Sequence, residues 1–210
     1  MTKLRPLAGL LSKIVLGTAL AASLSGCVAM AVGGAATAVL SANDRRTLGM
    51  QTEDKAINVK AELKLRQLTG ENGHINVTSY NRKVLLTGEV RDDTMKQAAE
   101  REVRAIDNVV SVINELEIAG PSSYTSRSND ALITTKVKAS LVDKKTVSAT
   151  AFKVTTERGI VYLQGLVTQR EGNIAADVAK GVPGVVKVVK IFEYIADEDP
   201  RANQPFQAQG

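Results

Sequence analysis

The sequence contains one cysteine, Cys27, and one histidine, His74. A lone thiol cannot form a disulfide within the chain, and one cysteine with one histidine falls short of the ligands that zinc needs. Serines and carboxylates show no spacing that indicates a catalytic triad. His74 follows a Gly-Glu-Asn-Gly run, which predicts a solvated loop. We therefore expect no catalytic residue, no metal and no cofactor, and a protein that is not an enzyme.

The segment before Cys27 has the composition of a secretory signal. Three basic residues precede an apolar run at residues 14–23, which is too short to span a bilayer. The Leu-Ser-Gly-Cys motif that ends at Cys27 resembles the lipobox of bacterial lipoproteins. That resemblance implies that residues 1–26 are cleaved off and that Cys27 is acylated, with palmitate among its acyl chains. The alternative is an ordinary signal peptide with a chance cysteine.

The residue after the lipobox bears on sorting. In lipoproteins an Asp after the acylated cysteine is the common inner-membrane retention signal, and here that residue is Val28. The resemblance therefore implies an outer-membrane protein that faces the periplasm. We expect residues 27–53 to form the lipidated cysteine and a tether.

Charge is distributed unevenly along the chain. Without the signal, the chain has 24 basic and 22 acidic residues, and it has no tryptophan for stacking on bases. We therefore expect no nucleic-acid partner. Residues 54–118 hold ten basic and eleven acidic side chains, whereas residues 128–197 hold ten and seven. The second segment thus has the more favourable charge for an anionic membrane surface.

An internal repeat organises the rest of the chain. The apolar pattern of residues 77–90 recurs at residues 154–167, an offset of 77 residues between Gly88 and Gly165. This period is too long for a solenoid unit and indicates two copies of one domain. A domain of about 60 residues buries only about 60% of the surface that its unfolded chain exposes, and it is therefore only marginally stable alone. We therefore expect the two copies to pack against each other.

Each copy shows the same order of elements, α-β-β-α-β. Ile57, Ala61 and Leu65 mark one helix face, as Ile133, Val137 and Leu141 do in the second copy, where Asn129-Asp130 resembles a helix cap. The pattern predicts an α+β fold, a two-layer α/β sandwich in which two helices cover a three-stranded sheet. The expected strands are 75–80, 84–90 and 109–118, then 152–156, 160–167 and 185–195, and the second helices are 94–105 and 170–180. The expected boundaries are 54–118 for domain 1, 119–128 for the linker, 129–196 for domain 2 and 197–210 for a disordered tail.

Two motifs in each copy resemble the BON domain. The first motif is Val-Leu-Leu-Thr-Gly at residues 84–88 of the first copy and Val-Tyr-Leu-Gln-Gly at residues 161–165 of the second. The second motif is a turn followed by the closing strand, and it begins at residue 106 in the first copy and at residue 182 in the second. The first copy departs from the pattern because it has Asn108 where a glycine is usual. Two BON units behind a lipobox resemble outer-membrane lipoproteins of the DolP and YraP type. The resemblance implies binding of anionic phospholipids through the second domain and a role in envelope integrity.

The first helix of the second copy contains the candidate phospholipid contact. Leu132 lies off the apolar face and beside lysines, an arrangement found in small membrane-surface patches. The resemblance implies that this helix touches lipid, often through a large aromatic at the position of Leu132. Alternatively, Leu132 is an ordinary exposed leucine. The candidate contacts are Leu132, Lys136, Lys138, Lys144 and Lys145.

The repeated glycines Gly88 and Gly165 lie within predicted strands, and we interpret them as structural residues packed beneath a helix. Two functions fit these patterns. One is a lipid-binding module of the envelope. The other is a protein-interaction adaptor that docks an outer-membrane assembly machine and binds little lipid itself. A haemolysin-like or osmotic-stress protein is compatible with either function.

Overall fold

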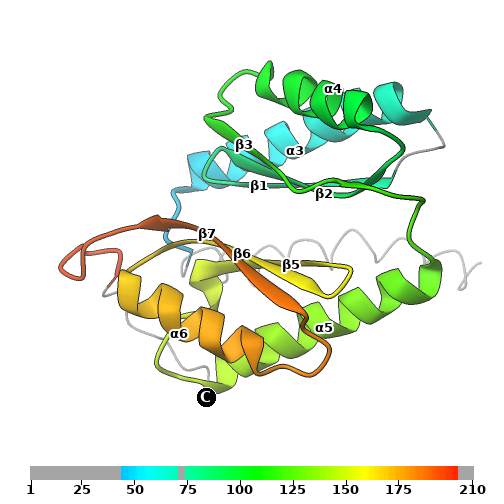
Figure 1. Ribbon diagram of the computed structural model, residues 1–210. Helices are drawn as coiled ribbons and strands as arrows, with labels where there is room; N and C mark the ends of the chain where they lie inside the picture. Colours follow the sequence, from blue (N-terminus) through cyan, green and yellow to red (C-terminus); the bar gives the residue numbers. More distant parts are fainter. Residues whose placement is uncertain (1–43, 71–73, 203–210) are drawn as a thin grey trace, which may run out of the picture. The chain divides into compact units, whose positions relative to one another are not determined.

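The computed structural model describes residues 44–70 and 74–202. Cys27, the signal and most of the expected tether lie outside the described residues. Contacts group residues 43–210 into one compact unit, which contains both repeats. The predicted α-β-β-α-β order is confirmed in each copy (Figure 1). The first copy consists of α3 (Leu48–Thr69), β1 (His74–Tyr80), β2 (Lys83–Val90), α4 (Asp93–Arg104), β3 (Ser111–Asn114) and β4 (Glu117–Ile118). The second consists of α5 (Tyr124–Asp143), η2 (Ala149–Ala151), β5 (Phe152–Glu157), β6 (Ile160–Val167), α6 (Gln169–Lys180) and β7 (Lys187–Tyr194).

The two sheets share one topology. β2 lies between β1, with which it is antiparallel, and β3, with which it is parallel, and β6 lies in the same way between β5 and β7. The parallel pairs require a crossover, which α4 and α6 supply. Figure 1 shows that the two helices of each copy cover the same face of its sheet. The expected α+β sandwich is therefore present twice.

Each core lies between the helices and one sheet face. In the second copy the predicted helix residues Ile133, Val137 and Leu141 are buried together with Val161 and Leu163 of β6. The first core is built in the same way, from Ile57, Ala61 and Leu65 of α3 with Val84 and Leu86 of β2. Alternate residues of the central strands thus point to the helices, as the period of two predicts.

The opposite sheet faces are also buried, because the two copies contact each other there. Leu85 is 0% exposed and Tyr162 is 2% exposed, although neither belongs to the cores beneath the helices. Tyr80 donates a hydrogen bond from its hydroxyl to the Ala151 carbonyl at 3.3 Å and accepts one from the Leu166 amide at 3.3 Å. Burial raises the pKa of Tyr80 to about 12, so its hydroxyl remains protonated. The prediction that the two domains pack against each other is confirmed.

A buried aspartate in the first helix of each copy holds the hairpin turn of that copy. Asp130 accepts hydrogen bonds from the amides of Arg158 and Gly159 at 2.9 and 2.8 Å. Asp54 accepts from the amides of Asn81 and Arg82 at 2.8 Å each. The interpretation of Asp130 as a helix cap was wrong, because the residue lies inside α5 and satisfies amides of the β5–β6 turn instead.

The second copy's first helix begins earlier than expected. Ser123 caps α5, and its hydroxyl accepts a hydrogen bond from the Ser126 amide at 3.1 Å. Residues 124–128, expected as linker, are therefore the first turn and a half of α5. The first amides of a helix lack partners within the helix, and a capping side chain satisfies one of them. The helix can therefore begin at Tyr124 although polar residues follow.

The end of the expected tether is also part of the fold. Thr47 caps α3, which begins at Leu48. Arg45 is 6% exposed, and its guanidinium bonds Glu171 at 2.7 and 2.8 Å and the Leu166 carbonyl at 3.0 Å. The Ala202 carbonyl accepts a further bond from Arg45 at 3.1 Å, so the expected disordered tail contacts the fold at Ala202.

The closing strand of the first copy is interrupted. β3 and β4 both pair with β2, and between them Leu116 is 1% exposed while its amide bonds the Asn114 side chain. The second copy's β7 pairs with β6 without a break. The expected continuous strand 109–118 is thus two short strands, because the chain turns Leu116 into the core.

The two repeated glycines each lie against a backbone carbonyl group of the preceding chain. A Cβ on Gly88, which has a φ of +112°, would lie 2.0 Å from the His74 carbonyl oxygen. A Cβ on Gly165 would lie 2.7 Å from the Ala151 carbonyl oxygen. Both glycines therefore permit a close approach of the preceding backbone: Gly88 lies against strand β1, and Gly165 lies against the end of the short 3-10 helix η2.

Candidate functional site

The outer face of α5 contains the candidate membrane contact. Leu132 is 58% exposed, whereas its neighbour Ile133 is 1% exposed. The helix register expected from the sequence is therefore confirmed at this point. An exposed leucine on the helix face turned from the core is available to a partner surface.

All four candidate lysines are exposed. Lys136 lies one turn after Leu132, so the two are neighbours on one helix face, and Lys138 lies on the other flank of the exposed face. Lys144 is the C-cap residue of α5, and Lys145 follows in a left-handed conformation with a φ of 53°. The structure thus spreads the lysines along the helix and around its C-terminal end rather than gathering them into one pocket.

Sequence reasoning missed two apolar residues of this face. Tyr124 is 87% exposed in the first turn of α5, and Val142 is 50% exposed in the last. Their spacing from Leu132 places all three on the side of the helix turned from the core. The expected linker, residues 119–128, contains Tyr124, and the Ser123 cap is the sequence signal that places Tyr124 in the helix. The guanidinium of Arg127 lies 5.5 Å from the Tyr124 ring centre.

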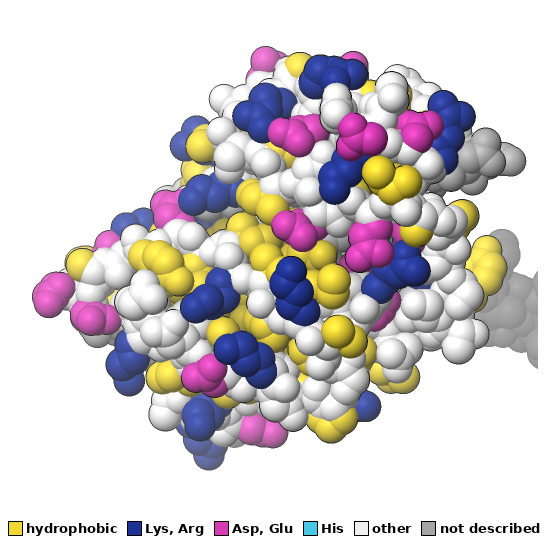
Figure 2. Space-filling view, viewed as in Figure 1, with side chains coloured by type: hydrophobic (Ala, Val, Ile, Leu, Met, Phe, Trp, Pro, Cys, Tyr) yellow, Lys and Arg dark blue, Asp and Glu magenta, His cyan; other side chains and the backbone are white. Residues whose placement is uncertain are grey.

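Positive charge continues from Lys138 to the neighbouring strand. The Lys153 side chain is exposed, but desolvation by the surrounding protein lowers its pKa. Repulsion from Arg46 and Lys138 lowers this pKa further, although Asp54 and Asp44 oppose the effect. Lys138 and Lys153 of the second domain therefore repel each other and Arg46, which precedes α3. On the face shown in Figure 2, by contrast, basic and acidic side chains are interspersed around hydrophobic ones.

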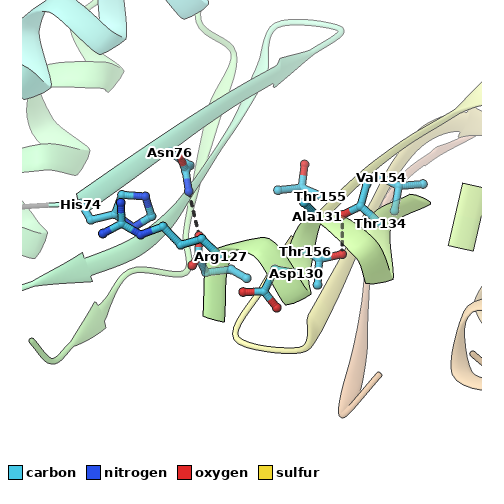
Figure 3. A pocket seen from close by; sticks show the side chains of 10 residues that line it. His74, Asn76, Arg127, Asp130, Ala131, Thr134, Val154, Thr155 and Thr156 are labelled. Carbon is cyan, nitrogen blue, oxygen red and sulfur yellow. Dashed lines mark hydrogen bonds between the residues drawn. The ribbon is translucent and has the colours of Figure 1, made fainter. Parts of the chain in front are cut away.

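A second feature is a hollow of about 440 Å³ lined by residues of both domains (Figure 3). Asn76 of β1 donates a hydrogen bond to Glu157 of β5 at 2.8 Å, and Thr134 of α5 donates one to Thr156 at 2.7 Å. Burial raises the pKa of Glu157, and the negative charges of Glu89 and Asp130 raise it further, while the Asn76 hydrogen bond and His74 oppose them.

His74 lies beside this hollow and not in a solvated loop. It is the first residue of β1, its side chain is 20% exposed, and Nδ1 lies 3.2 Å from Glu89 Oε2. That interpretation was therefore wrong. His74, Glu89 and Glu157 each offer a ligand atom within 4.8 Å of the others. Sequence reasoning considered only His and Cys ligands and did not find this group, because its three residues come from three different strands.

Comparisons with known proteins decide the family. The BON domain profile matches residues 54–120 and 129–196, beside the expected ranges 54–118 and 129–196. The chain belongs to the BON-domain family. It contains two copies of the domain, and the fold described above is that of each copy.

Three relatives are similar over most of the chain. Outer membrane lipoprotein DolP of Haemophilus influenzae is 39% identical over 175 residues, which cover 82% of this chain and 90% of the relative. A 21 kDa hemolysin of Actinobacillus pleuropneumoniae is 32% identical over 72% of this chain and 79% of its own length. Osmotically-inducible protein Y of Escherichia coli is 27% identical over 90% of this chain and 96% of its own length. Within residues 44–70 and 74–202, no helix combines the length and the apolar character needed to cross a membrane.

Proposed function

We propose that this protein is a non-enzymatic outer-membrane lipoprotein, anchored through Cys27 and facing the periplasm, whose second BON domain binds anionic phospholipid. Through that binding it supports envelope integrity, including under osmotic stress. The similarity to a protein named outer membrane lipoprotein supports the location. The lipobox at the start of the chain supports the anchor.

The observation that carries the lipid-binding proposal is the exposed face of α5. Leu132 is 58% exposed beside Lys136, and Tyr124 and Val142 extend the apolar character along the helix. Apolar side chains enter the headgroup region, while lysines beside them meet anionic headgroups. Each cation near an anionic leaflet contributes about 1 kcal/mol. A few such lysines bind weakly by themselves, but a tethered domain is already close to the membrane.

Vesicle co-sedimentation tests the proposal with residues 43–210, the compact unit that lacks the acylated cysteine. We expect binding to anionic but not to neutral vesicles, and a decrease with salt, because exposed charges are screened over about 8 Å at physiological ionic strength. Leu132→Glu and Lys136→Glu should each reduce binding without lowering the melting temperature. Their matched controls lie on α3 of the first domain: Leu63→Glu, at a leucine 56% exposed, and Lys60→Glu, at an exposed lysine. Equal binding by all four variants would contradict the α5 contact.

One observation favours the adaptor function as a second candidate. Val59 and Leu63, one turn apart on α3, are 57% and 56% exposed in the nearly neutral first domain. Two neighbouring apolar side chains on one helix face suit a protein partner better than a charged surface. If Leu63→Glu impairs envelope integrity in cells while Leu132→Glu does not, the adaptor function is favoured.

A further inference from the structure

We propose that His74, Glu89 and Glu157 form a binding site for a divalent transition-metal ion, with Zn²⁺ as the probe. Each side chain offers one ligand atom, and the three atoms lie within 4.8 Å of one another. Imidazole nitrogen and carboxylate oxygen are both ligands that zinc takes in proteins. Because His74 and Glu89 belong to the first domain and Glu157 to the second, a bound ion links the two domains.

The buried carboxylate of Glu89, one oxygen of which lacks a hydrogen-bond donor in the described part of the chain, is the independent observation that points to a cation. Its side chain is 0% exposed. Oε2 accepts a hydrogen bond from the Ser122 amide at 3.1 Å and faces His74 Nδ1 at 3.2 Å, but Oε1 has no hydrogen-bond partner in the described part of the chain. A buried carboxylate oxygen without a donor is costly. A metal ion bound there removes that cost.

Charges from the surrounding elements leave the site negative. Two further carboxylates face it, Asp130 from α5 and Glu117 from β4, and two guanidinium groups oppose them, from Arg127 and Arg158. Asp130 is committed to the amides of the β5–β6 turn. The four carboxylates and the two guanidinium groups together leave about two uncompensated negative charges, which one divalent ion neutralises.

Arg158 is the competitor that a metal ion must displace. Its Nη1 lies 3.8 Å from Glu89 Oε1, too far for a hydrogen bond, and 3.1 Å from Glu117 Oε2. Its side chain is 40% exposed. The guanidinium can therefore remain paired with Glu117 while the ion takes the place beside Glu89.

The hollow gives the site room to close. Zinc–ligand bonds of about 2.0–2.2 Å in a tetrahedron place ligand atoms about 3.4 Å apart. Because the ligand atoms here lie within 4.8 Å of one another, the most distant pair must approach by up to about 1.4 Å. His74 and Glu157 both line the hollow of about 440 Å³, and Figure 3 shows His74 at its side. Three protein ligands leave the fourth position to water from this space, which gives a solvent-accessible ion.

Isothermal titration of the full chain in detergent micelles, without a histidine tag, tests the proposal with ZnCl₂. We expect one ion per chain, and at least about tenfold weaker binding in His74→Asn and Glu157→Gln. Glu157→Gln keeps an oxygen for the Asn76 hydrogen bond, so the domain contact survives. Glu198→Gln, at an exposed glutamate, is the control with unchanged binding. Arg158→Asn should bind zinc more tightly, because it removes the competing cation and tolerates the positive φ of 49°.

Because His74 is the only histidine, NMR of its imidazole gives a second measurement on the parent chain. Zinc should shift the ring resonances of the parent in proportion to the bound ion. Absence of any titratable heat, unchanged imidazole resonances, or parent-like zinc affinity in both His74→Asn and Glu157→Gln overturns the proposal. Far-UV circular dichroism without zinc verifies that each variant is folded.

Discussion

The ion pair between Arg45 and Glu171 should be one of the largest single contributions to stability in the second half of the chain. Both side chains are nearly inaccessible, 3% and 8% exposed, and two short hydrogen bonds join them. Arg45→Met removes the guanidinium and leaves the Glu171 carboxylate buried without its partner. Breaking a buried pair in this way costs about 3–5 kcal/mol. For a folded unit of this length, about 2–4 °C per kcal/mol predicts a Tm lower by about 6–20 °C.

Thermal unfolding followed by circular dichroism at pH 7 measures this effect. Arg91→Met is the control, because the Arg91 side chain is 68% exposed and pairs with its neighbour Asp92. A double-mutant cycle with Glu171→Gln, which retains an oxygen for the Thr168 amide, should show that the double variant loses less than the two single variants together. If Arg45→Met melts within 1–2 °C of the parent, on the order of the effect of a surface substitution, then residues 44–47 belong to the tether and not to the fold.

Three further predictions concern buried residues that stabilise the two domains. Burial raises the pKa of Glu171, but the hydrogen bond and charge of Arg45, together with the hydrogen bonds of Thr168, outweigh it and hold the pKa below its usual value. The stability that these contacts contribute is therefore present above about pH 4.3 and is lost as pH falls through the folded pKa. This loss should be absent from the pH profile of Glu171→Gln. Asp130→Ala should lower the free energy of unfolding by about 3 kcal/mol in urea titrations, because two amides lose a charged acceptor, and a loss below about 1 kcal/mol would refute this role. Gly88→Ala should cost at least about 2 kcal/mol through backbone strain and the clash with the His74 carbonyl, whereas Gly120→Ala, which meets nothing within 4 Å, should cost little.

Local patterns were sufficient for the layout of each domain. Spacings of three and four residues located the core face of α5, and Ile133, Val137 and Leu141 are all buried. The alternation of apolar and polar residues located the central strands. The internal repeat showed the same pattern a second time for each element. These features depend on neighbours within one or two turns or one hairpin, which is why sequence alone predicts them.

Features that depend on distant partners were not predictable in this way. Arg45 meets Glu171 across 126 residues, and nothing in its own neighbourhood marks it as buried. His74, Glu89 and Glu157 converge only because β1, β2 and β5 meet at the contact between the domains. The onset of α5 was missed for a local reason, since a serine-rich segment is typical of linkers as well as of helix caps.

The central claim is that the exposed face of α5 enters an anionic membrane surface, and a single tryptophan tests it directly. The chain has no tryptophan, so Leu132→Trp places the only such fluorophore at the proposed contact, and Leu63→Trp places one at a leucine of similar exposure in the first domain. With residues 43–210, anionic vesicles should shift the emission of Leu132→Trp to shorter wavelength, neutral vesicles should not, and Leu63→Trp should change little with either. Unchanged emission from Leu132→Trp at saturating anionic lipid, or an equal shift from Leu63→Trp, would contradict the α5 contact.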